Sequence, residues 1–397
     1  MIIAPKVRGF ICTTAHPVGC AENVAQMVGY AKSCPGAAEG PRRALVIGAS
    51  GGYGLSSRIA AAFCYGASTI GVSLERPGAG QKTGTAGFYN NRAFEKLAAE
   101  AGLIAHSVNG DAFSESVKAE TVALIKNKLP GGKVDLVVYS IAAPRRTHPV
   151  TGEVFSSVIK PVGAPFTGST IQVLSGEMSE VTIEPATEGE IAGTVAVMGG
   201  EDWLLWMEAL GEAGVLAHGV TSVAYSYIGP ELTHAIYRGG TMGRAKDDLD
   251  QKAAQIASIV APIGGRAFVS VNKALVTQAS SAIPVVPLYI SLLYRIMKRN
   301  GTHEGCTEQM VRMLQRIYPE REGELTPAID QAGRLRMDDW EMNPKVQREI
   351  SELWGKISPE TLPELADAEG YRKDFFRLFG FEVPGVDYGA DVPEPLI

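Results

Sequence analysis

The chain has 397 residues, 45% of them hydrophobic and 20% charged, which is enough for one large domain with a substantial core. Its formal net charge of −6 argues against nucleic acid as the main partner, because phosphate contacts need clustered Lys and Arg. Residues 1–8 carry Lys6 and Arg8 and no long apolar run, unlike a secretory signal peptide. We therefore expect a cytoplasmic protein.

No transmembrane or metal-binding pattern stands out. The most apolar stretch, residues 282–293, is short and interrupted by Pro284 and Pro287, so it predicts a buried helix and no stable membrane insertion. The five cysteines are scattered and show neither a CxxC pair nor a zinc spacing, as is usual for reduced thiols. His303, near Glu304 and Cys306, has no partner histidine at metal spacing, so we expect no metal site.

Strands and helices alternate from residue 42 to residue 143. Residues 1–40 form an N-terminal extension with a short helix at about 22–32. The predicted strands are 44–48, 69–74, 103–108 and 134–140, and the predicted helices are 54–66, 90–101 and 114–128. The apolar runs lack period-two alternation, which indicates strands buried on both faces and hence a parallel sheet flanked by helices.

The alternation breaks after Ala143. Residues 144–200 contain strand candidates at 170–174 and 180–184, which predict an inserted hairpin that acts as a lid. A helix at 201–213 follows, with strands at 221–227 and 267–271. The tail from about Thr302 is helical and charged, as expected for a cap.

We therefore predict an α/β fold: a Rossmann-like doubly wound parallel sheet with an inserted lid region and a helical C-terminal extension. The whole chain, 1–397, is expected to be a single large domain. Its parts are an N-terminal extension (1–40), a dinucleotide-binding half (41–143), the inserted lid or hairpin (144–200), a catalytic half (201–300) and a helical C-terminal cap (301–397).

The stretch from Arg43 to Gly54 is the most informative part of the chain. An apolar run ending at Ile47 is followed by glycines at 48, 52 and 54, and then by a helix-compatible segment. Such glycines permit a tight turn and let a pyrophosphate approach the free N–H groups at a helix N-terminus. The Gly-x3-Gly-x-Gly spacing is the short-chain-dehydrogenase variant of the dinucleotide fingerprint, although similar turns are common in α/β proteins.

Glu75 supports this interpretation. It ends the second predicted strand, about 20 residues past the glycines, where an acidic side chain accepts hydrogen bonds from the adenosine ribose and repels a 2′-phosphate. The position favours NAD over NADP. Arg76 follows immediately and could compensate a phosphate, so both cofactors stay open at this point.

Tyr237 and Lys246 are the main candidates for chemistry. Both lie just beyond the fifth predicted strand. A reductase needs a proton donor beside the nicotinamide, and a tyrosine can serve where a nearby ammonium group stabilises its phenolate. A surface lysine and a half-buried tyrosine are the alternative. His234, three residues before Tyr237, is either a neighbour that supports it or a capping histidine.

Long strings of this chain resemble the FabV-type enoyl-acyl-carrier-protein reductases and the related trans-2-enoyl-CoA reductases. The resemblance covers essentially the whole chain. It is carried by residues 2–12, 16–20, 48–54, 139–149, 197–203 and 277–284, and by a Tyr-x8-Lys pair. Typical short-chain dehydrogenases use a shorter Tyr-x3-Lys spacing.

The resemblance implies roles for individual residues. Tyr237 would be the proton donor, Lys246 a catalytic residue and cofactor ligand, and Tyr227 a contact of the substrate thioester carbonyl. The implied cofactor-binding residues are Gly48, Ala49, Ser50, Gly51, Gly52, Tyr53, Leu74, Glu75, Asp111, Ala112, Ile141, Ala142, Lys246, Leu275, Val276 and Thr277. Each follows the carboxyl end of a predicted strand, where open α/β sheets bind ligands.

The implied activity is NADH-dependent reduction of the trans-2 double bond of enoyl thioesters, the last step of fatty acid elongation. A carbonyl reductase of the short-chain type and a non-catalytic dinucleotide sensor are the alternatives. The substrate would be carried by acyl-carrier protein or CoA, and the chain would act as a monomer. Arg145 and Arg146 are candidate docking residues for acyl-carrier protein, although guanidinium pairs also simply cap sheets. We expect the acyl tail to lie along Ile283 to Tyr289.

Overall fold

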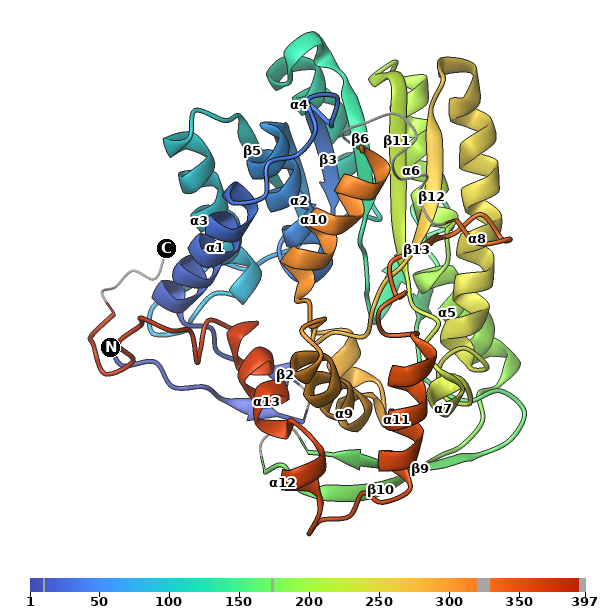
Figure 1. The fold of residues 1–397 in the computed structure, drawn as a ribbon. Coiled ribbons are helices and arrows are strands. Elements are labelled where there is room, and N and C mark those ends of the chain that lie inside the picture. The colour runs from blue at the N-terminus through green and yellow to red at the C-terminus, as the bar shows by residue number, and fades with distance from the viewer. Residues whose placement is uncertain (10, 173–174, 320–328, 393–397) are drawn as a thin grey trace.

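A seven-stranded parallel sheet forms the centre of the protein (Figure 1), and the computed structural model describes residues 1–9, 11–172, 175–319 and 329–392. The strand order is β13–β12–β11–β6–β3–β4–β5. The strands are β3 (Arg43–Ile47), β4 (Ser68–Ser73), β5 (Ala105–Asn109), β6 (Val134–Tyr139), β11 (Leu216–Ser226), β12 (Arg266–Val271) and β13 (Leu335–Arg336). Every neighbouring pair is parallel. The predicted doubly wound α/β fold is confirmed.

Helices cover both faces of this sheet. On one face lie α1 (Pro17–Lys32), α2 (Gly52–Tyr65), α3 (Ala86–Glu100) and α10 (Cys306–Ile317). On the other lie α4 (Glu115–Lys128), α6 (Glu201–Glu212) and α8 (Thr241–Val260). Successive residues of β3 separate accordingly: Ala44 and Val46 join the first apolar cluster, whereas Leu45 and Ile47 join the second. Both faces are therefore buried, which explains the unbroken apolar runs in the sequence.

The insertion after β6 holds two antiparallel hairpins and a helix. The hairpins are β7 (Arg145–Thr147) with β8 (Val154–Ser156), and β9 (Phe166–Ile171) with β10 (Met178–Ile183). The second is the predicted hairpin with its strands displaced toward the N-terminus, and Val173 and Leu174 lie outside the described residues. Helix α5 (Glu188–Met198) was not predicted. Its start is stabilised by reciprocal hydrogen bonds between Thr187 and Glu190.

The C-terminal extension is helical, and it also completes the sheet. It contains α11 (Pro344–Trp354), α12 (Leu362–Leu365) and α13 (Ala368–Arg377), which follow α9 (Val286–Arg299) and α10. Together with the hairpin β9–β10, helices α9 and α11 to α13 lie beyond one end of the sheet (Figure 1). Helix α10, in contrast, packs on α2, and β13 pairs with β12 as the edge strand.

Most predicted elements occur, with shifted ends. Helix α1 begins at Pro17 rather than at about 22, α3 begins at Ala86 rather than at 90, and β11 begins at Leu216 rather than at 221. The remaining elements are short: β1 (Val7–Arg8), β2 (Ile11–Cys12), α7 (Glu231–His234) and single 3₁₀ turns at 130–132, 261–263 and 280–282. Among the described residues, no helix combines the length and apolar character that a bilayer crossing requires.

Candidate active site

The turn from β3 into α2 needs its glycines for steric reasons. Gly48 has φ +86°, and a Cβ there would lie 2.3 Å from the carbonyl oxygen of Ser140, at the exit of β6. A Cβ on Gly54 would lie 1.9 Å from the carbonyl oxygen of Gly48. Both distances are far below contact, so the turn packs tightly between β3, β6 and the first turn of α2.

The other side of this turn is open. A Cβ on Gly51 would meet nothing within 4 Å, and Gly52, with φ +51°, has only Thr277 nearby. No side chain caps the N-terminus of α2. Its first N–H groups can therefore bind an anion such as a pyrophosphate, and the residues of this loop fit that role. Tyr53, the last residue of the predicted loop, instead donates from its hydroxyl to the carbonyl oxygen of Lys273 at 2.6 Å.

Glu75 follows β4 and is tied to the glycine loop. Its carboxylate accepts a hydrogen bond from Ser50 at 2.5 Å and another from the hydroxyl of Thr85. Its backbone exchanges hydrogen bonds of 2.7 and 2.9 Å with the side chain of Asn109. Arg76 is exposed. Two segments thus hold the Glu75 carboxylate, and a third holds its backbone.

The remaining predicted cofactor residues also follow strand ends. Leu74 follows β4, Asp111 and Ala112 follow β5, Ile141 and Ala142 follow β6, and Leu275, Val276 and Thr277 follow β12. The Cγ2 atom of Thr277 lies 3.6 Å from where a Gly52 Cβ would be. The loop after β12 therefore reaches across to the glycine loop, and the segments meet at the carboxyl edge of the sheet.

Tyr237 lies between α7 and α8 and is only 5% exposed. Its ring contacts that of Tyr227 edge to face, with 5.2 Å between centroids. Burial raises the pKa of Tyr237 above its ordinary value. Its hydroxyl has no hydrogen bond to any residue that the structure describes, so it can donate to a ligand.

Lys246 lies on α8, and its ammonium group donates to the carbonyl oxygen of Tyr225 at 3.1 Å. Burial lowers the pKa of Lys246 to about 8, opposed by the nearby charge of Asp250. The Tyr225 ring lies 5.7 Å from that of Tyr53, in the glycine loop. Lys246 is thus connected to the glycine loop through Tyr225, and it makes no hydrogen bond to Tyr237 in the described structure.

Sequence reasoning missed a buried glutamate beside these tyrosines. Tyr227, directly after β11, donates its hydroxyl to Oε1 of Glu341 at 3.1 Å. Glu341 is fully buried and lies between β13 and α11, more than a hundred residues away in sequence. It sits in a charged, helical tail without a motif, so no signal in the sequence could have identified it.

Other predicted polar residues serve packing. Arg146 is 1% exposed and donates to Glu201 and to the carbonyl oxygen of Ala196, both at 2.6 Å, so its expected docking role was wrong. Of the two candidate docking residues, Arg145 is the exposed one.

The candidate histidines make local contacts. The His234 ring nitrogen pairs with the carbonyl oxygen of Gly229 at 2.9 Å. His303 packs on Tyr294, and burial lowers its pKa to about 3. No set of three or more His, Cys, Asp or Glu in the described residues is placed to hold a metal.

The segment from Ile283 to Tyr289, which we expect to line the acyl tail, is apolar and buried. Ile283, Val286 and Tyr289 belong to the same apolar cluster as Tyr237. Val285, which precedes α9, has φ +63°, an unfavourable value for a β-branched residue. Its side chain lies against β9, with 3.2 Å from its Cγ1 to where a Gly168 Cβ would be. The hairpin β9–β10 therefore packs directly on the segment from Ile283 to Tyr289.

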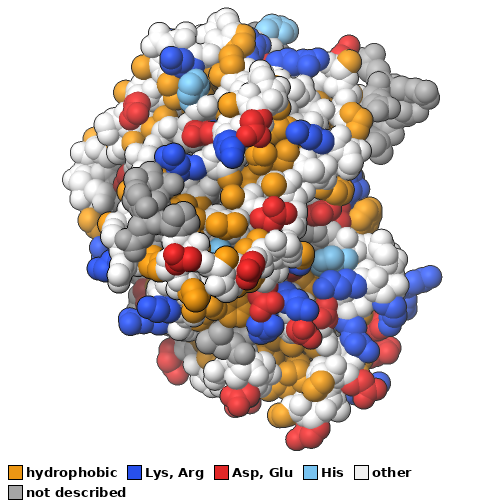
Figure 2. All heavy atoms as spheres, turned by 90° about the vertical axis from the view of Figure 1, so that its left-hand side faces the viewer, with side chains coloured by type: hydrophobic (Ala, Val, Ile, Leu, Met, Phe, Trp, Pro, Cys, Tyr) orange, Lys and Arg blue, Asp and Glu red, His pale blue; other side chains and the backbone are white. Residues whose placement is uncertain are grey.

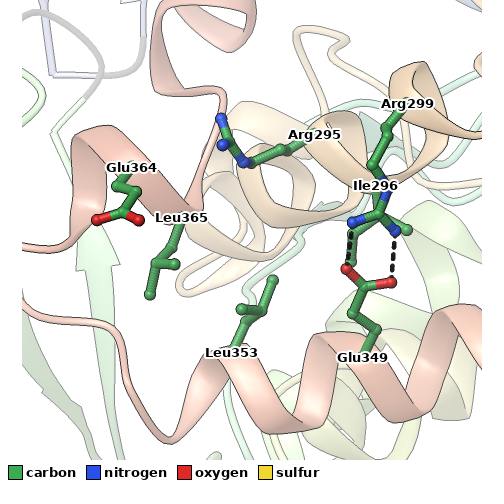
Figure 3. A pocket seen from close by; sticks show the side chains of 7 residues that line it. All are labelled: Arg295, Ile296, Arg299, Glu349, Leu353, Glu364 and Leu365. Atoms are coloured by element: carbon green, nitrogen blue, oxygen red, sulfur yellow. Dashed lines mark hydrogen bonds and ion pairs between the residues drawn. The ribbon is translucent and has the colours of Figure 1, made fainter.

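Two hollows lie at the opposite end of α9 and are not part of this site. One of about 170 Å³ is lined by residues of α9, α11 and α12, and Figure 3 shows Arg299 bound by two hydrogen bonds to Glu349 at its edge. Another of about 590 Å³ also includes Arg295 and reaches Gly176 in the β9–β10 turn. On the face shown in Figure 2, acidic and basic side chains are interspersed, and neither charge forms a continuous patch.

Three family models match consecutive parts of the chain. The NAD(P)H binding domain of trans-2-enoyl-CoA reductase matches residues 2–80, and the trans-2-enoyl-CoA reductase catalytic region matches residues 82–318. A third, described as an enoyl reductase FAD binding domain, matches residues 329–392.

The chain is also similar to whole proteins. It is 56% identical over 393 residues to a trans-2-enoyl-CoA reductase [NADH] of Ruminiclostridium cellulolyticum, covering 99% of this chain and 98% of that one. It is 56% identical over 394 residues to an enoyl-[acyl-carrier-protein] reductase [NADH] of Coxiella burnetii, covering 99% and 96%.

Two solved structures share the fold over nearly their whole length. One is the trans-2-enoyl-CoA reductase of Clostridium acetobutulicum in complex with NADH, with a TM-score of 0.94, 44% identity and coverage of 99% and 98%. The other is that of Treponema denticola in complex with NAD, with a TM-score of 0.93, 46% identity and coverage of 99% and 98%.

Residues 329–392 do not fit a flavin dinucleotide. Their described elements are a two-residue edge strand and three helices, without a strand–glycine turn–helix unit. Their large aromatic side chains, including Tyr371, Phe375 and Phe376, are already packed in the core with α9.

Proposed function

The chain belongs to the trans-2-enoyl-CoA reductase family, and we infer that it reduces the trans-2 double bond of enoyl thioesters with NADH. The observation that carries this inference is the meeting, at one edge of the sheet, of an open glycine turn with two tyrosines, Tyr227 and Tyr237, whose ring centroids are 5.2 Å apart. NADH bound at this turn supplies the hydride that the β-carbon of the substrate receives.

We propose that the protein residues manage the charge and the proton. Reduction at the β-carbon builds negative charge on the thioester oxygen, and a hydroxyl at Tyr227 or Tyr237 stabilises it. Tyr237 then supplies the proton, directly or through the enol. The raised pKa of Tyr237 keeps its hydroxyl protonated until the proton is transferred. Lys246, positioned on the Tyr225 carbonyl, binds the cofactor and favours the phenolate electrostatically.

We propose that the residues implied by the family resemblance bind the cofactor. Gly48 to Tyr53 hold the pyrophosphate, Leu74 and Glu75 the adenosine ribose, and Asp111 and Ala112 the adenine. Ile141 and Ala142 lie along the cofactor, and Leu275 to Thr277 contact the nicotinamide amide. The support is positional, because each segment leaves the same edge of the sheet. Ser50, which bonds Glu75, links the pyrophosphate and ribose sites.

The oligomeric state, the substrate carrier and the lid are further parts of the proposal. We propose a single-domain, monomeric cytoplasmic enzyme that takes its substrate from acyl-carrier protein or from CoA. The hairpin β9–β10 would act as the lid over an acyl tail lying along Ile283 to Tyr289. Because acyl-carrier proteins are acidic, exposed Arg145 is the docking candidate that remains.

A steady-state assay tests the activity. NADH oxidation is followed with crotonyl-CoA, with an enoyl group on acyl-carrier protein, and with a 3-ketoacyl thioester. Turnover of the two enoyl substrates is expected, and their ratio identifies the preferred carrier. Turnover of the 3-ketoacyl thioester alone would indicate a carbonyl reductase, and NADH binding without turnover of any substrate would indicate a sensor.

A further inference from the structure

Glu341 occupies an unusual position for a carboxyl group. It comes from the C-terminal segment, its side chain is fully buried, and it faces the candidate active site. Its Oε1 atom accepts from the hydroxyls of Tyr227 at 3.1 Å and of Tyr289 at 2.7 Å. Its Oε2 atom accepts from the N–H of Ala274 at 2.7 Å. Three segments that build the site, after β11, after β12 and in α9, therefore meet at one carboxyl group.

The direction of these hydrogen bonds has a chemical consequence. A carboxylate can only accept, so an ionised Glu341 engages the hydroxyl proton of Tyr227. That proton is then not available to a substrate oxygen. A protonated Glu341 can instead donate to the oxygen of Tyr227, which leaves the Tyr227 proton free to point into the cleft.

We propose that Glu341 is a positioning residue that decides whether Tyr227 donates its proton to the protein or to the thioester oxygen. This inference rests on the proposed function, in which Tyr227 contacts the thioester carbonyl. In the active arrangement the neutral carboxyl group donates to Tyr227 and Tyr227 donates to the substrate oxygen, so charge that develops there is stabilised through two hydrogen bonds in series.

The surroundings place this exchange near neutral pH. Burial raises the pKa of Glu341 to about 7, although hydrogen bonds from Tyr289 and Ala274 and the ammonium of Lys273 oppose the shift. Asp338, in the same turn, raises it further. Gln347 of α11 is uncharged and donates to the Glu341 carbonyl oxygen at 2.7 Å and to the Tyr289 hydroxyl at 3.1 Å.

The variant Glu341→Gln imitates the protonated form. Its amide oxygen can accept from the Ala274 N–H, while its NH₂ group donates to the Tyr227 and Tyr289 oxygens. The test measures kcat and kcat/KM for crotonyl-CoA from pH 6 to pH 9, in wild type and in this variant. NADH affinity and thermal unfolding are measured in parallel to show that the variant is folded.

In wild type we expect activity to fall above about pH 7, by up to about tenfold per pH unit for one ionisation. Lys246, with its pKa of about 8, contributes a second fall. In Glu341→Gln, only the fall in activity near pH 7 should disappear. The activity of this variant should therefore exceed that of wild type between about pH 7 and about pH 8. A wild-type-shaped profile in the variant, merely scaled down, would overturn the proposal, because a structural role lowers activity equally at every pH.

A double-mutant cycle provides the second test. Tyr227→Phe removes the hydroxyl through which Glu341 acts, so adding Glu341→Gln to it should leave the pH profile unchanged. An equal effect of Glu341→Gln with and without the Tyr227 hydroxyl would contradict the proposal. If wild type turns over neither crotonyl-CoA nor an enoyl group on acyl-carrier protein, the proposed function fails first, and that outcome is distinguishable because it does not depend on any variant.

Discussion

The hydroxyl of Tyr237, which we propose as the proton donor, makes no hydrogen bond to any residue that the structure describes. Tyr237→Phe removes only that oxygen and should cut turnover by a factor on the order of 10²–10⁴, which is typical of a lost general acid. NADH should still bind, because the glycine turn is untouched, and fluorescence titration checks this. Lys246→Met is the comparison and should weaken NADH binding as well as the rate. An unchanged rate in Tyr237→Phe would assign proton donation to Tyr227 or to water.

We propose that the carboxylate of Glu75 determines which cofactor fits. A 2′-phosphate would face a negative charge that Ser50 and Thr85 hold in place, so NADH should be preferred over NADPH. Glu75→Ala should narrow that preference, measured as the ratio of kcat/KM for the two cofactors. Asp111→Ala, at the end of the neighbouring strand, is the control that should leave the ratio near its wild-type value. A wild-type enzyme that used both cofactors equally would refute the assignment.

The start of α9 is the element on which substrate length should depend. Val286 and Tyr289 share an apolar cluster with Tyr237, and Val285 lies against β9, so a bulky residue near them narrows any path for an acyl tail. Ile283→Trp should penalise long enoyl substrates more than crotonyl thioester, compared by kcat/KM across a chain-length series. Equal losses on short and long substrates, in a variant that folds and binds NADH, would refute the acyl-tail position.

Helix α10 belongs to the body of the protein although it comes from the C-terminal extension. Met310 is fully buried between α10 and the sheet, in the cluster that includes α2. Met310→Ala should therefore lower the free energy of unfolding by about 2–5 kcal/mol, measured by denaturant titration. Gln315→Ala, a half-buried position on the same helix, should change it by about 0.5 kcal/mol or less. Equal effects of the two variants would mean that α10 is a loosely attached cap.

Ion pairs hold the C-terminal extension together and also attach it to α8. Arg312 and Arg316 of α10 both bind Asp339, and Arg334 beside β13 binds Asp250 of α8 at 3.4 Å. Together with the pairing of β13 and β12, these contacts place Glu341 within hydrogen-bonding distance of Tyr227. The whole-molecule arrangement thus brings a residue of the extension into the candidate active site.

The sequence by itself determined the doubly wound sheet, the glycine turn and the family. Apolar runs without alternation require a sheet covered on both faces, and the steric needs of Gly48 and Gly54 are local, so both are readable from a short stretch. The long strings shared with enoyl reductases pointed to the same family as the full-length comparisons. Local periodicity also indicated the inserted hairpin, though not its ends.

Only the tertiary structure decided which distant side chains meet. Arg146 is charged and was expected at the surface, but the fold buries it against Glu201. The edge strand β13 is only two residues long, too short for a periodic signal. Glu341 has no local pattern at all, and its chemistry arises from burial and from donors that come from three other segments. Contacts of this kind depend on chain positions far apart in sequence, so no window along the sequence contains them.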